Sequence, residues 1–424
     1  MRIAIVSLNL AQRNGDTRNV FSLALALQSQ GHELSMYTTE YSPSIFPDIQ
    51  REIKNINVIH PPVSANSLPE YESLAGKTLN RIKRISMERG AVKAIRDHLR
   101  TDLDLLICGN DYSYSLGKWY KRKNPRTKVA WFVHNTPYFR TLKKGCMYDL
   151  FSRCASLFEW LRVKRYMSGI DLIIVNDVEH KKLTGKLGVP VILLRIPVDF
   201  ERFYQTVRPR PKNKNEVTVL GIGSLSPARN FEDIIIAGAL LKEKGYHSKI
   251  ILICKDFWKD ESYKKFLLRL AKEKGMEESV EFWFKGASEE ELKEVESLAD
   301  IFVVATHINA WSMSVSEAMV AGLPVVLSKT CSNCEILKDG VNALFFESGD
   351  TKELADKVDS LVRNPEFYEH IACSGQEFVK DNLTIGKYLK DFLSAIDINR
   401  QIKDVDDGSS GPDGVSHPQR RGNS

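Results

Sequence analysis

The stretch THINAWSMSVSEAMVAGLPVV, residues 306–326, holds a turn, a helix start, one acidic residue and a Gly-x-Pro stop between two apolar runs. The run before it, residues 299–305, has the continuous apolar character of a buried parallel strand, and Pro324 opens the next strand. Between them, residues 314–321 have helical spacing. A helix that starts beyond the C-terminal end of a parallel strand points its free N–H groups at a crevice that suits phosphate-bearing ligands. We expect Glu317, in the first turns of this helix, to face the same crevice.

Strand and helix patterns alternate twice along the chain. The first array predicts strands at residues 2–8, 33–38, 56–60, 104–108, 128–134, 171–176 and 191–194, and helices that include 18–30, 74–99 and 148–167. The second array predicts strands near Val217, Lys249, Val280, Ile301, Pro324 and Ala343, each followed by a helix. Two such arrays in series predict an α/β protein with two doubly wound domains that face each other.

Composition divides the chain further. We expect a first domain at residues 1–205, a polar linker at 206–216, a second domain at 217–380, a C-terminal helix at 381–397 and a disordered tail at 398–424. The tail is expected because the sequence from Asp404 onward has almost no apolar residues. A length of 424 residues suits two domains, since single cores stop growing near about 250 residues.

The segment 306–326 resembles the donor site of the retaining GT-B glycosyltransferases, in particular glycosyltransferase family 4. The family has a glutamate, a small-aromatic-small turn, a second glutamate eight positions on, and then Ala-x-x-x-Gly-x-Pro. Here the second half is intact from Glu317 to Pro324, the first glutamate is replaced by Asn309, and the turn is Ala310-Trp311-Ser312. The resemblance implies the GT-B architecture, in which two Rossmann-like domains enclose a cleft for donor and acceptor.

A second matching motif follows the strand near Val217. The family has Gly-Arg-Leu, three variable residues and then Lys-Asn or Lys-Gly, whereas this chain has Gly223-Ser224-Leu225 and, three residues later, Arg229-Asn230. Ser224 therefore replaces the family's arginine, and Arg229 keeps the charge of its lysine. A guanidinium can bind a diphosphate through two hydrogen bonds. The resemblance assigns Arg229 to the diphosphate leaving group.

Weaker similarities lie elsewhere. Gly15 stands where the family has a Gly-Gly loop near the donor phosphate, and Asp16 or Thr17 would serve as the N-cap of the helix that follows. His134, at the end of a strand, matches a histidine that approaches the transferred sugar, with a purely structural role as the alternative. Glu335 matches a glutamate that meets the sugar or the diphosphate, and the alternative for this stretch is that Ser332 or Asn333 caps a short helix.

The resemblance implies a full set of site residues. The catalytic residues would be His134, Arg229 and Asn309. The donor would be bound by residues of both domains: Gly15, Gly223, Ser224, Arg229, Asn309, Ala310, Trp311, Ser312, Met313, Ser314 and Glu317. Glu317 would hold the ribose hydroxyls, and the amides of residues 314–316 the phosphate. No metal or cofactor is expected and no side chain is assigned as nucleophile, because stabilisation of the departing diphosphate is thought to carry much of the rate.

Two short motifs carry no metal site in this interpretation. Cys331-x-x-Cys334 has no partner pair at zinc spacing, and Asp102-Leu103-Asp104 leads into a buried strand. Seven cysteines without a framework spacing favour free thiols in a reducing compartment.

Charge is unevenly distributed. Residues 1–200 contain 30 Lys and Arg against 18 Asp and Glu, while the whole chain has a net charge of +6. A basic first half can contact an anionic membrane, although solvated helix faces explain the same pattern, and nucleic acid is not expected as a partner. No stretch reaches the roughly 20 apolar residues of a membrane span, so we expect a cytoplasmic protein, with peripheral contact at the inner membrane face as a further option.

The sequence thus predicts a hexosyltransferase-type enzyme of polysaccharide biosynthesis. It would move a sugar from a nucleotide-diphosphate sugar to a glycan, lipid-linked or small-molecule acceptor, with retention and without metal. Asn309 and Ser224 keep a second hypothesis open, in which the chain is a catalytically degenerate homologue that serves as a binding or scaffold partner of another transferase. A phosphorylase or a sugar-nucleotide epimerase of the same fold is a third.

Overall fold

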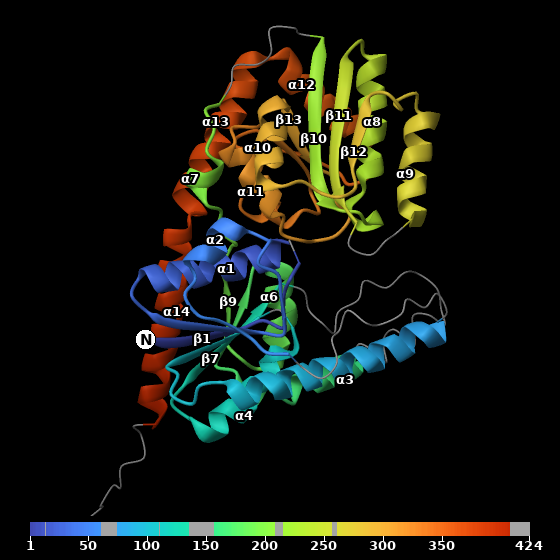
Figure 1. Ribbon diagram of the computed structural model, residues 1–424. Helices are drawn as coiled ribbons and strands as arrows, with labels where there is room; N and C mark the ends of the chain where they lie inside the picture. Colours follow the sequence, from blue (N-terminus) through green and yellow to red (C-terminus); the bar gives the residue numbers. More distant parts are fainter. Residues whose placement is uncertain are drawn as a thin grey trace, which may run out of the picture.

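The computed structural model describes residues 1–12, 14–60, 74–109, 111–134, 157–207, 215–256 and 261–407. Two parallel sheets, each covered by helices, form two domains that are stacked end to end (Figure 1). The two-domain α/β architecture expected from the sequence is therefore confirmed.

The N-terminal domain is built on a seven-stranded parallel sheet of order β5-β3-β1-β6-β7-β8-β9. Its strands are β1 (Arg2–Val6), β3 (Glu33–Thr38), β5 (Ile56–Val58), β6 (Leu105–Cys108), β7 (Lys128–Val133), β8 (Leu172–Val175) and β9 (Val191–Leu193). A short pair, β2 (Asn9–Leu10) with β4 (Glu40–Tyr41), forms a separate small sheet. All seven predicted strands are confirmed, each within about two residues of its expected ends.

This sheet has a core on each face, because successive strand residues point to opposite sides. Ile3 and Ile5 belong to the core beneath α1, while Ala4 and Val6 belong to the core beneath α3. The helices of the domain are α1 (Gly15–Ser29), α2 (Pro47–Glu52), α3 (Leu74–His98), α4 (Ser115–Lys123) and α6 (Val178–Thr184). The helix predicted at residues 148–167 is described only from Leu157, and residues 157–164 are helical.

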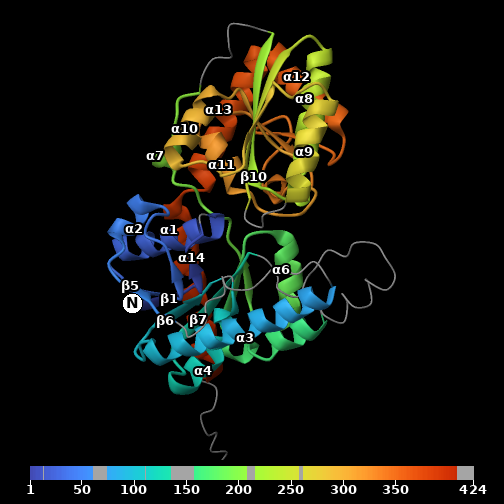
Figure 2. The same ribbon diagram turned by 45° about the vertical axis from the view of Figure 1, so that its right-hand side comes forward.

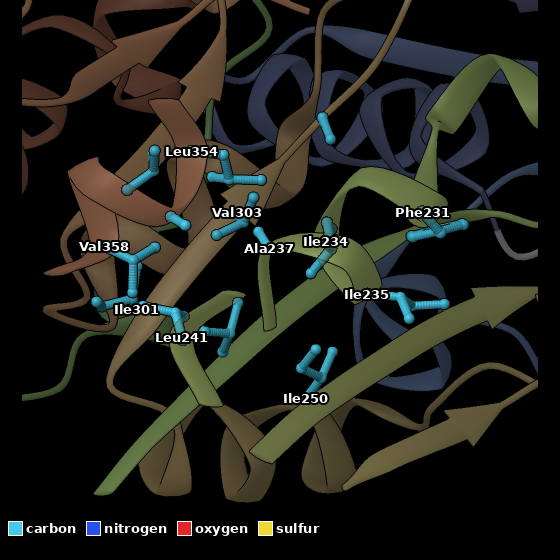
Figure 3. Packing of buried hydrophobic residues seen from close by; sticks show 14 of the residues in the cluster. Phe231, Ile234, Ile235, Ala237, Leu241, Ile250, Ile301, Val303, Leu354 and Val358 are labelled. Atoms are coloured by element: carbon cyan, nitrogen blue, oxygen red, sulfur yellow. The ribbon is translucent and has the colours of Figure 1, made fainter. Parts of the chain in front are cut away.

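The C-terminal domain contains a six-stranded parallel sheet of order β12-β11-β10-β13-β14-β15. Its strands are β10 (Glu216–Ser224), β11 (His247–Lys255), β12 (Val280–Trp283), β13 (Ile301–Val304), β14 (Val325–Ser328) and β15 (Leu344–Phe346). The helices are α8 (Phe231–Glu243), α9 (Glu261–Glu273), α10 (Glu289–Leu298), α11 (Met313–Val320), α12 (Thr351–Arg363) and α13 (Pro365–Asn382). Figure 3 shows one face of the sheet, where Ile234 and Leu241 of α8 pack with Ile250, Val303 and Val358.

The chain crosses between the domains twice, and the two crossings lie side by side. The first contains α7 (Phe200–Phe203), and the Val198 N–H donates to the Leu383 carbonyl of the second at 2.8 Å. After the second crossing, α14 (Ile385–Asp407) runs along the N-terminal domain (Figure 1 and Figure 2). There Tyr388 and Phe392 join the same core as α1.

The end of α14 corrects one expectation. The helix continues to Asp407, ten residues past the predicted end at 397, so the disordered tail does not begin at 398. The prediction relied on the polar composition from Asp404 onward, which by itself does not prevent a helix. Residues 408–424 lie outside the described part of the chain. None of the described helices has both the length and the apolar character that a membrane span requires.

Candidate functional site

The helix α11 begins where the sequence predicts, after the loop that follows β13. Its N-cap, Ser312, makes no side-chain capping hydrogen bond, and its hydroxyl lies 2.9 Å from the Ser314 hydroxyl. The first N–H groups of a helix have no intrahelical acceptor, and the partial positive charge there favours an anion. The start of α11 can therefore receive a phosphate group.

The loop before α11 is fixed by the 3₁₀ turn at Ser332–Glu335. The Ser312 N–H donates to Asn333 Oδ1 at 2.9 Å, and Asn333 Nδ2 donates to the Ser312 carbonyl at 3.2 Å. The Ser332 N–H donates to the Ala310 carbonyl at 3.2 Å, and its hydroxyl donates to Asn309 Oδ1. Asn309 is exposed, whereas Trp311 and Asn333 are buried. The predicted sugar-binding turn is thus held rigidly, by an amide that the sequence had suggested only as a helix cap.

Arg229 lies at the C-terminal edge of the second sheet. Its aliphatic carbons pack on Gly223, where a Cβ would come within 3.3 Å of Arg229 Cγ and Cδ. Burial lowers the pKa of Arg229 from its usual value. Within the described part of the chain, no carboxylate forms an ion pair with it. Arg229 is partly buried, and a partly desolvated guanidinium without a counter-charge suits an anionic ligand.

Arg229 is tied to the loop that leads to α11. The carbonyl of its neighbour Ala228 accepts hydrogen bonds from the His307 N–H and the Thr306 hydroxyl, both at 2.9 Å. The structure therefore brings the two donor motifs of the C-terminal domain together, although they are about 80 residues apart in sequence.

Ser224, at the end of β10, is a register partner of Lys255, the last residue of β11. Register partners in a parallel pair project to the same face of the sheet. Lys255 therefore begins at the sheet edge where the family's arginine is missing, and its aliphatic carbons pack against Gly286. Sequence reasoning did not identify it, because a lysine at a strand end carries no motif of its own.

The start of α1 meets the start of α11 across the domain boundary. Asn14 is the N-cap of α1, and its side chain accepts from the Thr17 N–H at 2.8 Å. The expectation that Asp16 or Thr17 would be the cap is wrong, because the helix begins three residues earlier than predicted. Gly15 touches Met313, and a Cβ on Gly15 would lie 2.8 Å from the Met313 sulfur.

Glu317 faces the N-terminal domain. Its Oε1 accepts from Arg18 Nη1 at 2.6 Å, and both side chains are buried. Sequence reasoning missed Arg18, because an arginine in the first turns of an amphipathic helix reads as a solvated residue. The predicted contact between Glu317 and a ribose stays a prediction.

His134 and Glu335 lie in loops: His134 at the end of β7, and Glu335 at the end of the 3₁₀ turn that follows β14. His134 directly follows β7, is buried, and lies 6.1 Å from the Phe132 ring centroid. Glu335 accepts from Arg195 Nη1 at 2.6 Å and from the Val178 N–H at 3.1 Å, so it contacts the N-terminal domain. The sugar-directed roles inferred for these two residues stay predictions.

The other motifs are engaged structurally. Asp102 pairs with Arg2 and Arg100, each at 3.0 Å, on the surface. Cys331 and Cys334 are free thiols, and burial raises the pKa of Cys331 to about 11. Among the described residues, no group of three or more His, Cys, Asp or Glu side chains is placed to hold a metal ion.

Comparisons with known proteins show which family and which fold this chain resembles. Residues 205–378 match the family described as Glycosyl transferases group 1. An uncharacterized glycosyltransferase of Methanocaldococcus jannaschii is 21% identical over 87% of this chain and 99% of its own length. Mannosylfructose-phosphate synthase of Agrobacterium fabrum is 22% identical over 88% of this chain and 86% of its own length.

Solved structures are similar over almost the whole chain. Sucrose-phosphate synthase from Thermosynechococcus elongatus has a TM-score of 0.72 at 17% identity, covering 95% of this chain and 99% of that one. HepE of Anabaena in complex with UDP-glucose has a TM-score of 0.70 at 13% identity, covering 94% and 99%. The fold is that of a two-domain GT-B protein. The match over residues 205–378 and the similarity to a glycosyltransferase over most of the chain confirm the sequence-based recognition of a GT-B glycosyltransferase.

Proposed function

We propose that this chain transfers a sugar from a nucleotide-diphosphate sugar to a glycan, lipid-linked or small-molecule acceptor, with retention of configuration and without a metal ion. The observation that carries this proposal is Arg229, a partly buried guanidinium that no carboxylate pairs with among the described residues. Arg229 lies beside the loop that leads into α11. The N-cap of α11, Ser312, makes no side-chain capping hydrogen bond. A guanidinium and a helix start together suit a diphosphate.

Charge stabilisation accounts for the expected chemistry. When the sugar leaves the donor, negative charge develops on the diphosphate, and Arg229 and the first amides of α11 are placed to stabilise it. Asn309 can hydrogen-bond a sugar hydroxyl but supplies no negative charge beside a developing cation. His134 would approach the sugar from the opposite domain, and contact between the domains would exclude water from the reaction.

HepE and the synthases guide the choice of donor. The HepE structure holds UDP-glucose, which makes a uridine diphosphate sugar the first donor to test here. The retaining course and the absence of a metal requirement rest on the resemblance to glycosyltransferase family 4 and on the cations already present in the site.

A lipid-linked acceptor is supported by one surface feature. The helical segment 157–164 exposes Leu157, Phe158 and Leu161, which are 57%, 61% and 54% accessible. Lys164 and Arg165 follow directly and are also exposed. Apolar side chains flanked by basic ones suit the surface of an anionic membrane.

The scaffold hypothesis remains the second candidate because of Asn309 and Ser224. Thermal unfolding of the purified chain separates the transferase from the scaffold hypothesis. The transition temperature is measured with UDP, GDP, ADP and their sugar conjugates, once in EDTA and once in magnesium. A ligand at a hundred times its dissociation constant stabilises the folded chain by about 2.7 kcal/mol. A selective shift that persists in EDTA supports the donor site without metal. If no nucleotide shifts the transition, the scaffold hypothesis gains. NMR of the product's anomeric proton then tests retention.

A further inference from the structure

A buried cluster of charged side chains joins the two domains next to α11, which we call the donor helix. We define the interdomain ion cluster as Arg18 of α1, Arg202 of α7, Glu289 of α10 and Glu317 of α11. Arg18 Nη1 donates to Glu317 at 2.6 Å, and Arg18 Nη2 lies 3.6 Å from Glu289. Arg202 Nη2 donates to Glu289 at 2.6 Å. Two cations thus balance two carboxylates inside the boundary.

Arg18 is the only member of this cluster that belongs to the N-terminal domain. Its guanidinium lies 4.4 Å from the centre of the Phe203 ring, and the whole side chain is about nine-tenths buried. Phe203 and the donor helix share one hydrophobic core, so α7, α10 and α11 form one unit. Separation of the domains would therefore withdraw Arg18 and leave Arg202 paired with Glu289.

Helix α1 contacts α11 at two points. Gly15, the first residue of α1, touches Met313, the first residue of α11. One turn further along each helix, Arg18 binds Glu317. The contact with Glu317 therefore fixes the start of α1 against the start of α11, where we place the diphosphate.

Among the described residues, no hydrogen-bond acceptor lies within reach of the buried Nη2 of Arg18, although Glu289 is 3.6 Å away. A buried donor without an acceptor is costly, and removal of the cation that pairs with the buried Glu317 is costlier still. Arg18 is thus held by the charge of Glu317 and Glu289, which fix it in the contact between the domains.

We propose that Arg18 is a positioning residue that couples the approach of the two domains to binding of a nucleoside diphosphate at the start of α11. The identity of the ligand rests on the proposed function, whereas the coupling rests on the contacts of Arg18 alone. A ligand that binds only when both helix starts are together gains affinity from any residue that holds them together.

Three variants test this coupling: Arg18→Gln, Arg18→Lys and the control Arg2→Gln, which removes an exposed arginine of the same domain. Small-angle scattering without ligand reports the separation of the domains, and calorimetry reports the affinity for UDP. Arg18→Gln should enlarge the radius of gyration and weaken UDP binding about tenfold, as expected when a buried pair is broken. Arg18→Lys should lie between Arg18→Gln and wild type, because an ammonium cannot bridge both carboxylates. Arg2→Gln should match wild type.

A double variant distinguishes coupling from general damage. If Arg18 acts through Glu317, Arg18→Gln added to Glu317→Gln should change UDP affinity by much less than it does alone. With an active donor, Arg18→Gln should raise the KM for donor while leaving the KM for acceptor unchanged. Circular dichroism checks that each variant is folded. If Arg18→Gln does not fold, Arg18→Lys is compared with wild type instead.

The outcomes separate this inference from the proposed function. If wild type binds no nucleotide, the proposed function fails, but the ligand-free scattering of Arg18→Gln against wild type still decides whether Arg18 holds the two domains together. An unchanged radius of gyration together with unchanged UDP affinity in a folded Arg18 variant overturns the inference. Fully additive effects in the double variant also overturn it.

Discussion

Arg18 and Arg229 are two arginines in opposite surroundings. Arg18 lies between two glutamates, whereas no carboxylate among the described residues pairs with Arg229. Arg229 is partly buried, and a partly desolvated cation without a counter-charge lowers stability unless a ligand supplies the anion. Arg18 therefore marks a contact between the domains, and Arg229 marks the place for an anionic ligand.

Glu296 gives a prediction about pH at the same scale. Burial, and then the charge of Glu317, raises the pKa of Glu296 to about 8, from the usual 4.5. The other charged groups around it are Arg18, Lys293 and Glu289. Between about pH 4.5 and 8 the folded chain keeps a proton that the unfolded chain has released, so the free energy of unfolding falls with rising pH by about 1.4 kcal/mol per unit.

Glu296→Gln removes this fall, because glutamine does not ionise. Compared with wild type, the variant should gain stability as the pH rises from 5 to 8. Denaturant unfolding of both proteins at the two pH values measures the difference. A difference that does not change with pH would show that Glu296 titrates normally.

At the scale of elements, the start of α11 depends on the neighbouring 3₁₀ turn. The Asn333 side chain accepts a hydrogen bond from the Ser312 N–H and donates one to the Ser312 carbonyl, and the residue is only 1% exposed. Asn333→Ala should lower the free energy of unfolding by about 2–3 kcal/mol and weaken nucleotide binding, because two buried backbone groups lose their partner. Asn382→Ala, an exposed asparagine that donates only to a local carbonyl, is the control. Equal effects of the two substitutions in calorimetric unfolding would refute this role of Asn333.

The approach of α4 to the 3₁₀ turn at Met167–Gly169 gives a second prediction for elements. A Cβ on Gly169 would lie 2.1 Å from the Lys118 backbone nitrogen. Gly169→Ala must force two backbone segments apart, so we expect a loss of about 3 kcal/mol or more. Gly90→Ala, in α3 with no atom within 4 Å of its Cβ, should instead stabilise by about 0.5–1 kcal/mol. Thermal unfolding that ranks the two variants in the reverse order would contradict the packing described here.

At the scale of the whole molecule, the C-terminal helix belongs to the N-terminal domain. Phe392 of α14 is fully buried and stacks on Phe132 of β7 at 6.0 Å. Phe392→Ala should cost about 3 kcal/mol and loosen the first sheet, although the residue follows the second domain in sequence. Hydrogen exchange should show faster exchange in β1 and β7 than in wild type, with β10 and β13 unchanged. Faster exchange in β10 and β13, with β1 and β7 unchanged, would contradict the assignment of α14 to the N-terminal domain.

The sequence predicted the sheets well, because buried parallel strands are continuous apolar runs bounded by loops. It also located the start of α11 within one residue. It did not predict Arg18, Asn333 or Arg195, since their partners are distant in sequence. Polar side chains become buried here through contacts between domains or loops, and no local pattern records such contacts.

The central claim is that Arg229 and the start of α11 bind the diphosphate of a nucleotide donor. Calorimetric titration of UDP into wild type and Arg229→Ala, both in EDTA, tests it most directly. We expect saturable binding to wild type and binding at least about tenfold weaker in the variant, since a charge-assisted hydrogen bond contributes about 1.5–3 kcal/mol. Equal affinity of the two proteins, or binding to wild type that EDTA abolishes, would contradict the claim.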